Sequence, residues 1–385
     1  MDSPMTSSRL DGADAETRFY LPAPTGTGGI TATRLKNGPG AGIDLVELDS
    51  GQLKVWICPT RGMGIWRAER GGIPVEWKSP VRQLVHPSLV NLHARNGLGW
   101  LDGFNELVCR CGLAFNGPPE TDSGNPSPIE SAVTLHGRIA NLPAHDVEAR
   151  IEGDRLVCEG TVSETTLFGP QLQLRSRVEL TLGGTAFDIV DVVTNVGAGP
   201  TELELLYHIN VGRPFLAEGG RITLPHRQVV PRDPRAAEGI DSYETCLGPT
   251  PGYAEQAYYF EPIADSQGRS IALLRNAEGD RGFSVEFQPA ELPRFVAWKC
   301  TQPEAAGYVT GLEPATNFPN PKSFERAQGR VISLAAGASY RSTLRIGVHD
   351  SAASVSAVET RIAEIQAEPP TIHRTPQRGW SPAGE

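Results

Sequence analysis

The sequence lacks long apolar runs, an excess of basic residues and a dense set of cysteines. No run of 18 apolar residues occurs in the 385-residue chain, which argues against a membrane-spanning helix. Its 45 acidic residues outnumber the 35 basic ones, and the net charge of −10 argues against nucleic-acid binding, which normally needs a basic surface. Residues 1–18 are polar and lack the apolar segment of a signal peptide. We therefore expect a soluble cytoplasmic protein with no membrane and no nucleic-acid partner.

The six cysteines are too scattered to form the disulfide framework of a small secreted protein. Cys109 and Cys111 are two residues apart, so an extended strand would point both to the same face. A metal site would need further ligands at suitable spacing, and none lies nearby in the sequence. We interpret the cysteines as reduced thiols.

Helical periodicity is scarce, whereas glycine (42) and proline (32) together make up almost a fifth of the chain. The clearest helical pattern spans residues 352–367, where Val355, Val358, Ile362 and Ile365 recur at three- and four-residue intervals. Strand patterns are much more frequent. The segments that we interpret as strands are residues 45–59, 156–161, 171–182, 187–195, 202–207, 271–276, 283–287, 295–299 and 340–348.

Residues 171–182 alternate well between apolar and polar side chains, with a single break at Ser176. Many strands with few helices between them predict an all-β protein, a large antiparallel β-sandwich with one short C-terminal helix. We assign residues 1–20 to a flexible N-terminal segment, 21–367 to a single sandwich domain and 368–385 to an irregular tail. Residues 122–128 and 217–234 are rich in turn-forming residues and predict long loops.

Three segments combine a titratable side chain with a sequence suited to a site. His136 is followed by Gly137, which leaves room beside the imidazole, and His208 lies where a strand gives way to Asn210. Glu313 is flanked by apolar residues just before a loop rich in proline and asparagine. Each side chain taken alone also fits a structural role, since a lone histidine in a strand is often a hydrogen-bonded structural residue.

Together, in the order His, His, Glu, these segments resemble the galactose mutarotase-like family, also called aldose 1-epimerases. The resemblance spans residues 45–348 and is closest to a less characterised, aldose 1-epimerase-like branch that is described as a domain of unknown function. The segments that carry it are Pro59-Thr60-Arg61-Gly62-Met63, Gly103-Phe104-Asn105-Glu106-Leu107, Cys111-Gly112-Leu113, Leu135-His136-Gly137, Tyr207-His208-Ile209-Asn210 and Gly311-Leu312-Glu313-Pro314. The second histidine motif departs from the usual His-x-Tyr-Phe-Asn, and Arg138 stands where many mutarotases have glycine.

The resemblance implies a galactose mutarotase-like supersandwich and an aldose 1-epimerase that interconverts the anomers of a monosaccharide by acid/base ring opening. It implies that Glu313 is the general base, that His208 is the general acid and that His136 stabilises charge at the ring oxygen. The implied reaction needs no metal and no organic cofactor.

Sugar sites usually combine an aromatic platform with planar polar groups, which suggests further substrate-binding residues. The candidates are Arg61, Asn105, Arg138, Asp241, Trp298, Lys299 and Asn317. Asp241 lies roughly where the family carries an aspartate that binds a sugar hydroxyl, but its surroundings match poorly. Trp298 fits a core position equally well, and Arg61 fits a turn.

An acidic, sulfonated or phosphorylated sugar is a further hypothesis, because arginine binds planar and tetrahedral anions through two hydrogen bonds. The basic residues that we consider for it are Arg61, Arg95, Arg110, Arg138 and Lys299.

Two other functions stay open at this point. The same acid and base could enolise a keto-sugar, giving isomerisation, epimerisation or β-elimination, and His86, His93 and His226 leave room for a metal ion in that reaction. A non-catalytic carbohydrate-binding protein would need aromatic and polar groups but no acid–base pair. Exposed sheet edges leave a homodimer open, and the sequence does not identify the sugar.

Overall fold

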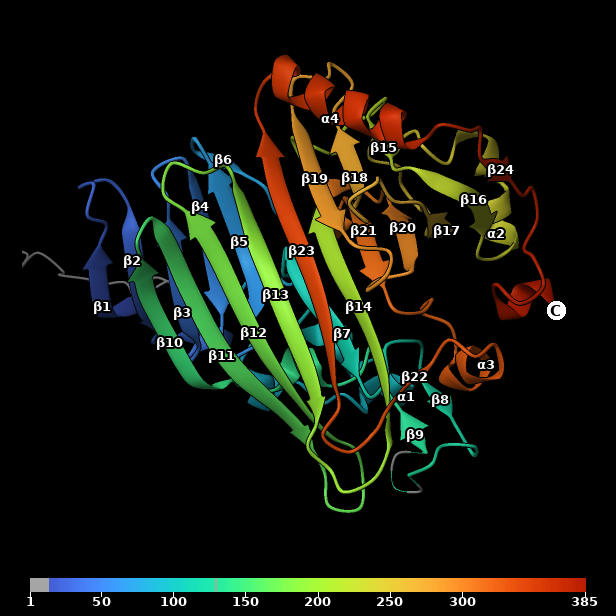
Figure 1. The fold of residues 1–385 in the computed structure, drawn as a ribbon, viewed down its shortest axis with the longest axis horizontal. Coiled ribbons are helices and arrows are strands. Elements are labelled where there is room, and N and C mark those ends of the chain that lie inside the picture. The colour runs from blue at the N-terminus through green and yellow to red at the C-terminus, as the bar shows by residue number, and fades with distance from the viewer. Residues whose placement is uncertain (1–13, 128, 130) are drawn as a thin grey trace, which may run out of the picture.

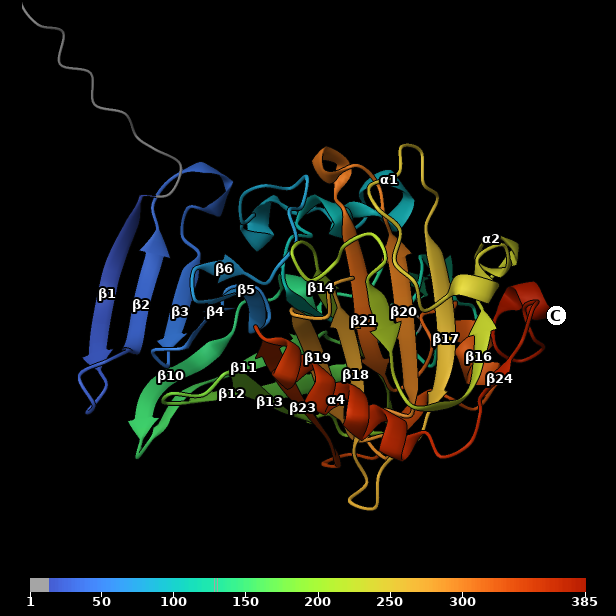
Figure 2. The same cartoon turned by 90° about the horizontal axis from the view of Figure 1, so that it is seen from above.

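Two large β-sheets dominate the computed structural model, which describes residues 14–127, 129 and 131–385. The sheets pack face to face, as two perpendicular views show (Figures 1 and 2). The first sheet has 14 strands and the second has eight. A separate two-stranded sheet pairs β8 (Glu120–Thr121) with β9 (Ala132–Val133). The predicted β-sandwich is confirmed.

The first sheet extends from the N-terminal strands to the C-terminal tail. Its strands, in spatial order, are β1 (Ala15–Pro22), β2 (Gly29–Leu35), β3 (Asp44–Asp49), β4 (Leu53–Cys58), β5 (Gly64–Arg70), β7 (Val108–Leu113), β14 (Thr201–Val211), β21 (Val309–Ala315), β20 (Arg294–Cys300), β17 (Gln256–Pro262), β16 (His226–Pro231) and β24 (Thr371–Ile372). Two short strands, β6 (Ile73–Pro74) and β22 (Ile332–Leu334), pair with β5 and β14 outside this order. Neighbouring strands are antiparallel, except that β24 runs parallel to β16.

The second sheet contains long strands from the middle of the chain. In spatial order they are β10 (His145–Glu152), β11 (Arg155–Thr165), β12 (Gln171–Thr181), β13 (Ala186–Asn195), β23 (Ser339–His349), β19 (Gly282–Phe287), β18 (Ser270–Arg275) and β15 (Arg221–Thr223). The α-helices are α1 (Ala94–Gly97), α2 (Pro234–Ala237), α3 (Lys322–Ala327) and α4 (Ala352–Ile365). Within the described part of the chain, none of them is long and apolar enough to cross a membrane.

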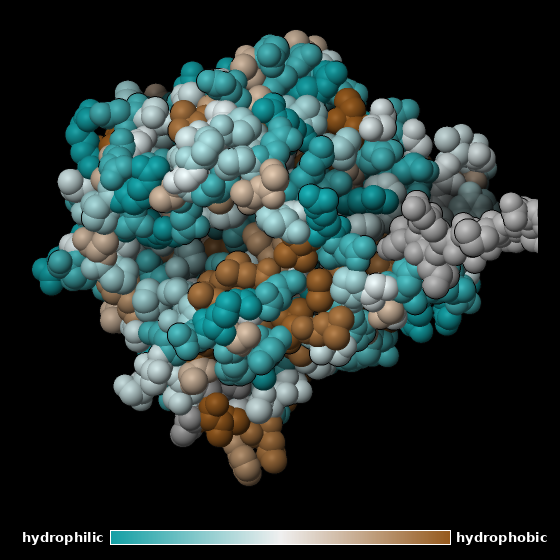
Figure 3. Space-filling view, turned by 180° about the vertical axis from the view of Figure 1, so that it is seen from behind, coloured by the Kyte–Doolittle hydropathy of each residue, from teal (hydrophilic) through white to brown (hydrophobic). Residues whose placement is uncertain are grey.

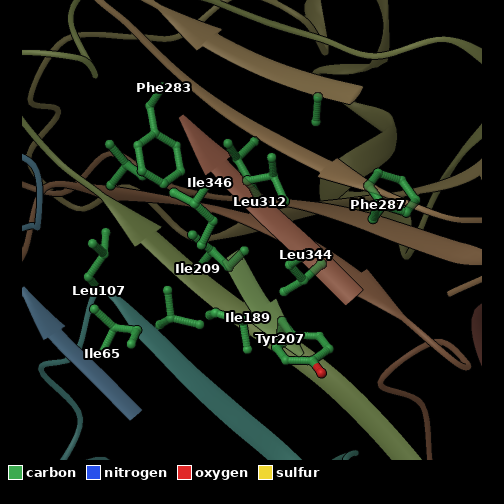
Figure 4. Close-up of a cluster of buried hydrophobic side chains, with 14 of the residues drawn as sticks. Ile65, Leu107, Ile189, Tyr207, Ile209, Phe283, Phe287, Leu312, Leu344 and Ile346 are labelled. Carbon is green, nitrogen blue, oxygen red and sulfur yellow. The ribbon is translucent and has the colours of Figure 1, made fainter. Parts of the chain in front are cut away.

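The main hydrophobic core lies between the two sheets. Because side chains alternate along a strand, every second residue of β14 and β21 points into it, including Tyr207, Ile209 and Leu312 (Figure 4). The second sheet contributes residues such as Ile189 and Ile346 from the opposite side. The other residues of β14 and β21 therefore point to the outer face of the first sheet, which carries the candidate site.

The break in the alternation of β12 has a structural cause. Leu174 and Val178 are fully buried in the core, and Ser176 between them is equally buried. Its hydroxyl accepts a hydrogen bond of 2.7 Å from the guanidinium of Arg110, which also lies between the sheets. A small polar side chain at this apolar position thus satisfies a buried cation.

Helix α4 confirms the predicted C-terminal helix. Val355, Val358 and Ile362 pack on Ile271 and Leu273 of β18, so the helix covers the outer face of the second sheet. Ser351 caps its first turn by accepting a hydrogen bond from the backbone N–H of Ser354.

Three expected irregular segments contain regular structure. Residues 217–234 form β15 and β16, so the prediction of one long loop there is wrong: the turn-forming residues only separate short strands. Strand β1 begins at Ala15 within the expected N-terminal segment, whose first 13 residues lie outside the described part of the chain. In the tail, β24 extends the first sheet, and Trp380 stacks on Phe318 with ring centroids 5.2 Å apart.

Candidate active site

A cavity of about 520 Å³ opens on the outer face of the first sheet, where Figure 3 shows apolar side chains gathered in the middle of the surface. Its floor consists of residues from β14, β20 and β21, and its walls come from residues 77–104 and the segment around His136. The aromatic side chains that line it are Trp77, Trp100, Phe104 and Trp298. Such walls suit the apolar faces of a sugar ring.

Strand pairing brings His208, Glu313 and Trp298 together from three adjacent strands. Ile209 of β14 pairs with Leu312 of β21 in an antiparallel register, which places His208 and Glu313 directly opposite each other on the outer face. Trp298 of β20 pairs with Gly311 of β21, two residues before Glu313 on the same face. The rings of His208 and Trp298 lie 5.2 Å apart, edge to face.

Gly311 provides the space that the Glu313 carboxyl occupies. A Cβ atom built on Gly311 would lie 2.2 Å from Oε1 of Glu313 and 3.2 Å from the Cβ of Trp298. The carboxyl group folds back along its own strand over this glycine, so any side chain there would displace it. The Gly-Leu-Glu motif thus has a steric explanation.

His136 reaches the cavity from a loop. Its backbone has a positive φ of 58°, and the next residue, Gly137, has a φ of 71°. A side chain on Gly137 would collide with two carbonyl oxygens, those of Phe115 and Gly112, at 2.3 and 2.4 Å. The glycine thus allows the loop to pack closely against β7, and this packing holds the imidazole 5.5 Å from that of His208.

Hydrogen bonds fix the neutral tautomers of both histidines. Asn210 donates both amide hydrogens to the carbonyl oxygens of Glu106 and His208, so its Oδ1 accepts a hydrogen bond of 2.6 Å from Nδ1 of His208. Nδ1 of His136 donates to the carbonyl oxygen of Asn116 at 2.8 Å. Each imidazole therefore keeps Nε2 as its free proton acceptor.

Glu313 and His208 form a buried acid–base pair. Oε1 of Glu313 lies 3.4 Å from Nε2 of His208 and makes no hydrogen bond to a described residue. Burial raises the pKa of Glu313 well above its usual range, and the nearby Glu255 carboxylate adds to the effect. Burial, helped by His136, lowers the pKa of His208 to about 3, and burial lowers that of His136 to about 4. Burial thus favours the neutral form of all three side chains, the protonated carboxyl of Glu313 and the neutral imidazoles of His136 and His208.

Glu255, Arg232 and Trp100 also line the cavity, although none of them was a sequence candidate. Glu255 lies at the mouth, where it accepts hydrogen bonds from Trp298 (2.7 Å) and Arg232 (3.0 Å). The indole N–H of Trp100 is buried and has no hydrogen-bond partner among the described residues, so it can serve as a donor to a ligand. No sequence pattern marks these positions, because they lie on segments that only the folded chain brings together.

Three of the expected substrate-binding residues have internal roles instead. Arg61 is almost completely buried and pairs with Glu106 at 2.6 Å, with further hydrogen bonds to carbonyl groups. The amide nitrogen of Asn105 donates to the carbonyls of Val81 and Gln83, outside the cavity lining. Lys299 alternates with Trp298 along β20 and therefore points to the other face, where it donates to the carbonyls of Ser242 and Thr245.

The remaining candidates also lie outside the cavity lining. Arg138 donates to the Thr166 hydroxyl in a different depression. Asp241 is largely exposed and pairs with Arg374. Asn317 is buried in a hydrogen-bond network with Asn116 and Glu204, and Asn116 in turn supplies the carbonyl that holds His136. Asn317 thus acts, at most, by positioning His136.

The basic residues considered for an anionic substrate are also absent from this cavity. Arg95 pairs with Asp102 at the surface, and Arg110 pairs with Asp191 inside the sandwich. Among the described residues, no group of three or more His, Cys, Asp or Glu side chains is arranged to hold a metal ion. His86, His93 and His226 do not converge: His86 contacts Ser88, and His226 lies in the core beside Tyr243.

The fold and the site together define a galactose mutarotase-like sandwich protein, the class that the sequence resemblance implies. More specifically, the chain belongs to the family described as Domain of unknown function (DUF4432), whose model matches residues 40–348. No curated protein matches the chain.

Solved structures show the same class. A Klebsiella pneumoniae protein provisionally described as an aldose 1-epimerase is 32% identical over 94% of this chain and 99% of its own, with a TM-score of 0.86. A galactose mutarotase-like protein from Clostridium acetobutylicum (16% identity, 84% of this chain, 99% of that chain, TM-score 0.57) shares the fold. So does galactose 1-epimerase from Lactobacillus acidophilus (11% identity, 84% and 100% coverage, TM-score 0.54).

Proposed function

We propose that the protein is an aldose 1-epimerase that interconverts the anomers of a monosaccharide, with Glu313 and His208 as its acid–base pair. The observation that carries the proposal is the 3.4 Å approach of Glu313 to Nε2 of His208 at the floor of an aromatic cavity. Ring opening needs one group that removes the proton of the C1 hydroxyl and another that protonates the ring oxygen. With one proton between the carboxyl and the imidazole, the pair would supply both groups.

The tautomer of His208 determines the path of that proton. Nδ1 is committed to Asn210, so Nε2 alone can accept and donate a proton inside the cavity. Hydroxyl groups of a bound sugar would donate hydrogen bonds to Glu313, stabilise its carboxylate and favour transfer of the proton to His208. Glu313 would then be the base and His208 the acid, as the family resemblance implies.

In the forward step, Glu313 removes the proton of the C1 hydroxyl while the bond between C1 and the ring oxygen breaks. His208 protonates the ring oxygen, and the free aldehyde rotates about the bond between C1 and C2. In the reverse step His208 takes the proton back from that hydroxyl as its oxygen attacks C1, and Glu313 reprotonates the C1 oxygen. The N–H of Trp100 and Nε2 of His136 provide one donor and one acceptor for sugar hydroxyls.

The test is the mutarotation rate of freshly dissolved α-anomers of common hexoses and pentoses, followed by polarimetry or NMR exchange. We expect acceleration of at least one sugar, and a loss of about 10²- to 10⁴-fold in kcat for Glu313→Gln. Glu364→Gln, the same change on the exposed side of α4, is the matched control and should retain full activity.

No acceleration of any sugar would refute the proposal. Mutarotation exchanges no carbon-bound hydrogen, so deuterium uptake into a keto-sugar would instead support enolisation by the same pair. Sugar binding that survives Glu313→Gln, without any turnover by the wild type, would support a carbohydrate-binding protein.

A further inference from the structure

A second cavity, of about 510 Å³, lies next to the candidate active site. Trp77, Ser79 and Val81 line both cavities, so this short segment forms a common wall. The neighbouring residues Ala305 and Ala306 are divided between them, the first lining the second cavity and the next lining the active-site cavity. The two cavities are therefore adjacent along two separate stretches of chain.

Arg67 is the central feature of the second cavity. Its guanidinium carbon lies 4.3 Å from the ring centroid of Trp56 and 4.5 Å from that of Trp66, so two indole rings hold it in place. It forms no hydrogen bond and no ion pair with a described residue, although its charge interacts with that of nearby Glu76, and its Nε is buried without a hydrogen-bond partner. A planar cation that is oriented by aromatic rings, with its N–H groups unused, is suited to bind an oxyanion through paired hydrogen bonds.

Two more cations line this cavity. Lys78 and Arg82 are exposed and form no ion pair with a described residue. Two carboxyl groups are also present: Glu304 is already paired with Arg213, and Glu76 has a pKa raised by its burial. Arg67, Lys78 and Arg82 thus outnumber Glu76, the one carboxyl without an ion pair, which interacts with Arg67, and the cavity attracts negative charge.

The second cavity also offers an acceptor for a hydroxyl group. Asn105 is 5% exposed, and its amide nitrogen is fully used by two backbone carbonyls. Its Oδ1 is buried without a partner, and Asn105 lines the cavity. An inorganic oxyanion satisfies only the cations, whereas a hydroxylated anion satisfies Asn105 as well.

We propose that this second cavity is a binding site for an oxyanion, a carboxylate or phosphate, with Arg67 as its main ligand and Lys78 and Arg82 at its entrance. The two sources of such a group are an acidic or phosphorylated sugar and a free inorganic anion. The acceptor oxygen of Asn105 and the wall shared with the active-site cavity favour the sugar. That choice of source rests on the proposed sugar chemistry, whereas the anion site itself does not.

The experiment is calorimetric titration at low ionic strength with inorganic phosphate, D-galacturonate and D-galactose. The variants are Arg67→Met, which keeps an unbranched apolar side chain between the indole rings, and Lys78→Ala/Arg82→Ala, which changes only exposed residues. Arg227→Gln, an exposed arginine on β16 whose nearest carboxylate is 3.9 Å away, removes the same charge elsewhere and is the matched control.

We expect phosphate and galacturonate both to bind the wild type, and each to bind Arg227→Gln as tightly as it binds the wild type. In Arg67→Met the ratio of galacturonate affinity to galactose affinity should fall at least about tenfold, the loss of one charge-assisted hydrogen bond or more. The ratio of galacturonate affinity to galactose affinity should also fall in Lys78→Ala/Arg82→Ala. This measurement tests the site even if Arg67→Met does not fold. Galacturonate that binds more tightly than phosphate identifies a sugar as the source, and the reverse order identifies a free anion.

Two results would overturn the proposal. Either neither anion binds the wild type, or Arg67→Met and Lys78→Ala/Arg82→Ala bind both anions as tightly as the wild type does. The outcome is separable from the proposed function. If anion binding depends on Arg67 but no sugar mutarotates, the anion site stands and the epimerase proposal fails. Conversely, mutarotation without Arg67-dependent anion binding removes only the anion site.

Discussion

Two consecutive residues of β14 belong to two buried polar clusters that differ in one respect. Tyr207 points between the sheets, where its hydroxyl donates to Asp191 at 2.7 Å, and Asp191 also accepts two hydrogen bonds from Arg110. His208 points to the outer face and approaches Glu313, whose Oε1 has no hydrogen-bond partner among the described residues. The first cluster is satisfied internally, and the second is open to a ligand.

The difference indicates what each cluster does. Arg110 spends its remaining hydrogens on Ser176 and the carbonyls of Gly62 and Met63, so a ligand would find no free group there. In the pair of His208 and Glu313, by contrast, Oε1 of Glu313 lies 3.4 Å from Nε2 of His208 and still lacks a hydrogen-bond partner. Unsatisfied buried polar groups in a cavity are costly to stability, so their presence favours a role in binding or chemistry.

The largest expected effect is on the satisfied cluster. Asp191→Ala leaves Arg110 buried without its counter-ion and should lower the free energy of unfolding by about 3–5 kcal/mol, measured by urea denaturation. Asp188→Ala, on the exposed face of the same strand, breaks a surface pair with Arg345 and should cost at most about 1 kcal/mol. Equal losses in the two variants would contradict the contrast.

Gly311→Ala tests the open cluster without removing any of its polar groups. The new methyl group would displace the Glu313 carboxyl from His208, and kcat should fall about 100-fold while the unfolding midpoint changes little. Gly199→Ala, at a glycine with no atom within 4 Å of the added Cβ, is the control. Unchanged turnover in Gly311→Ala would show that the position of the carboxyl is unimportant.

A smaller effect concerns the dependence of stability on pH. The pKa of Glu313 is higher in the folded protein than its ordinary value of 4.5, so the folded state retains a proton that the unfolded chain releases as pH rises above that value. Glu313 therefore lowers stability increasingly with pH, and Glu313→Gln removes this cost. The melting temperature of the variant should exceed that of the wild type by on the order of 2 °C at pH 8 and by less at pH 5.

The histidines act in the opposite direction. Their folded pKa values lie below 6.5, so they lower stability as pH falls below that value, in the variant as in the wild type. Thermal melts of both proteins from pH 5 to 8 isolate the contribution of Glu313. A melting-temperature gap that stays constant across this range would contradict the raised pKa.

The smallest effect is expected for Asp241→Asn, which belongs to neither cluster. Its carboxylate is 69% exposed and pairs only with exposed Arg374, so the unfolding free energy should change by less than about 1 kcal/mol. Turnover should be that of the wild type. A large loss of turnover in a sugar assay would restore the role that the sequence resemblance implied for this aspartate.

The fold was largely predictable because alternating strands are local patterns. Residues 171–182 alone identify β12, and the four apolar positions of residues 352–367 identify α4. Strand pairing was not predictable in the same way. Tyr207 of β14 pairs with Arg110 of β7, and Ile209 with Leu312 of β21, about a hundred residues away on either side. These contacts set the geometry of the site.

The candidate site was predictable where a short motif carries it. His136, His208 and Glu313 converge on one cavity, and Trp298 joins them. Lys299 could not share that face, since adjacent residues of a strand point to opposite sides. Trp77 lies outside regular structure and Trp100 in a short 3₁₀ helix, and the position of both depends on the whole fold. Only the folded structure shows that the buried Nε of Arg67 has no hydrogen-bond partner.

The C-terminal tail has a practical consequence for handling the protein. Trp380 stacks on Phe318, and its carbonyl accepts a hydrogen bond from Asn320, both in the loop that follows Glu313. Truncation before β24, or a purification tag fused directly to the last residue, would disturb a cover over the strand that carries the reactive carboxyl. Recombinant versions intended for activity measurements should therefore keep residues 368–385 intact and carry any tag at the other end of the chain.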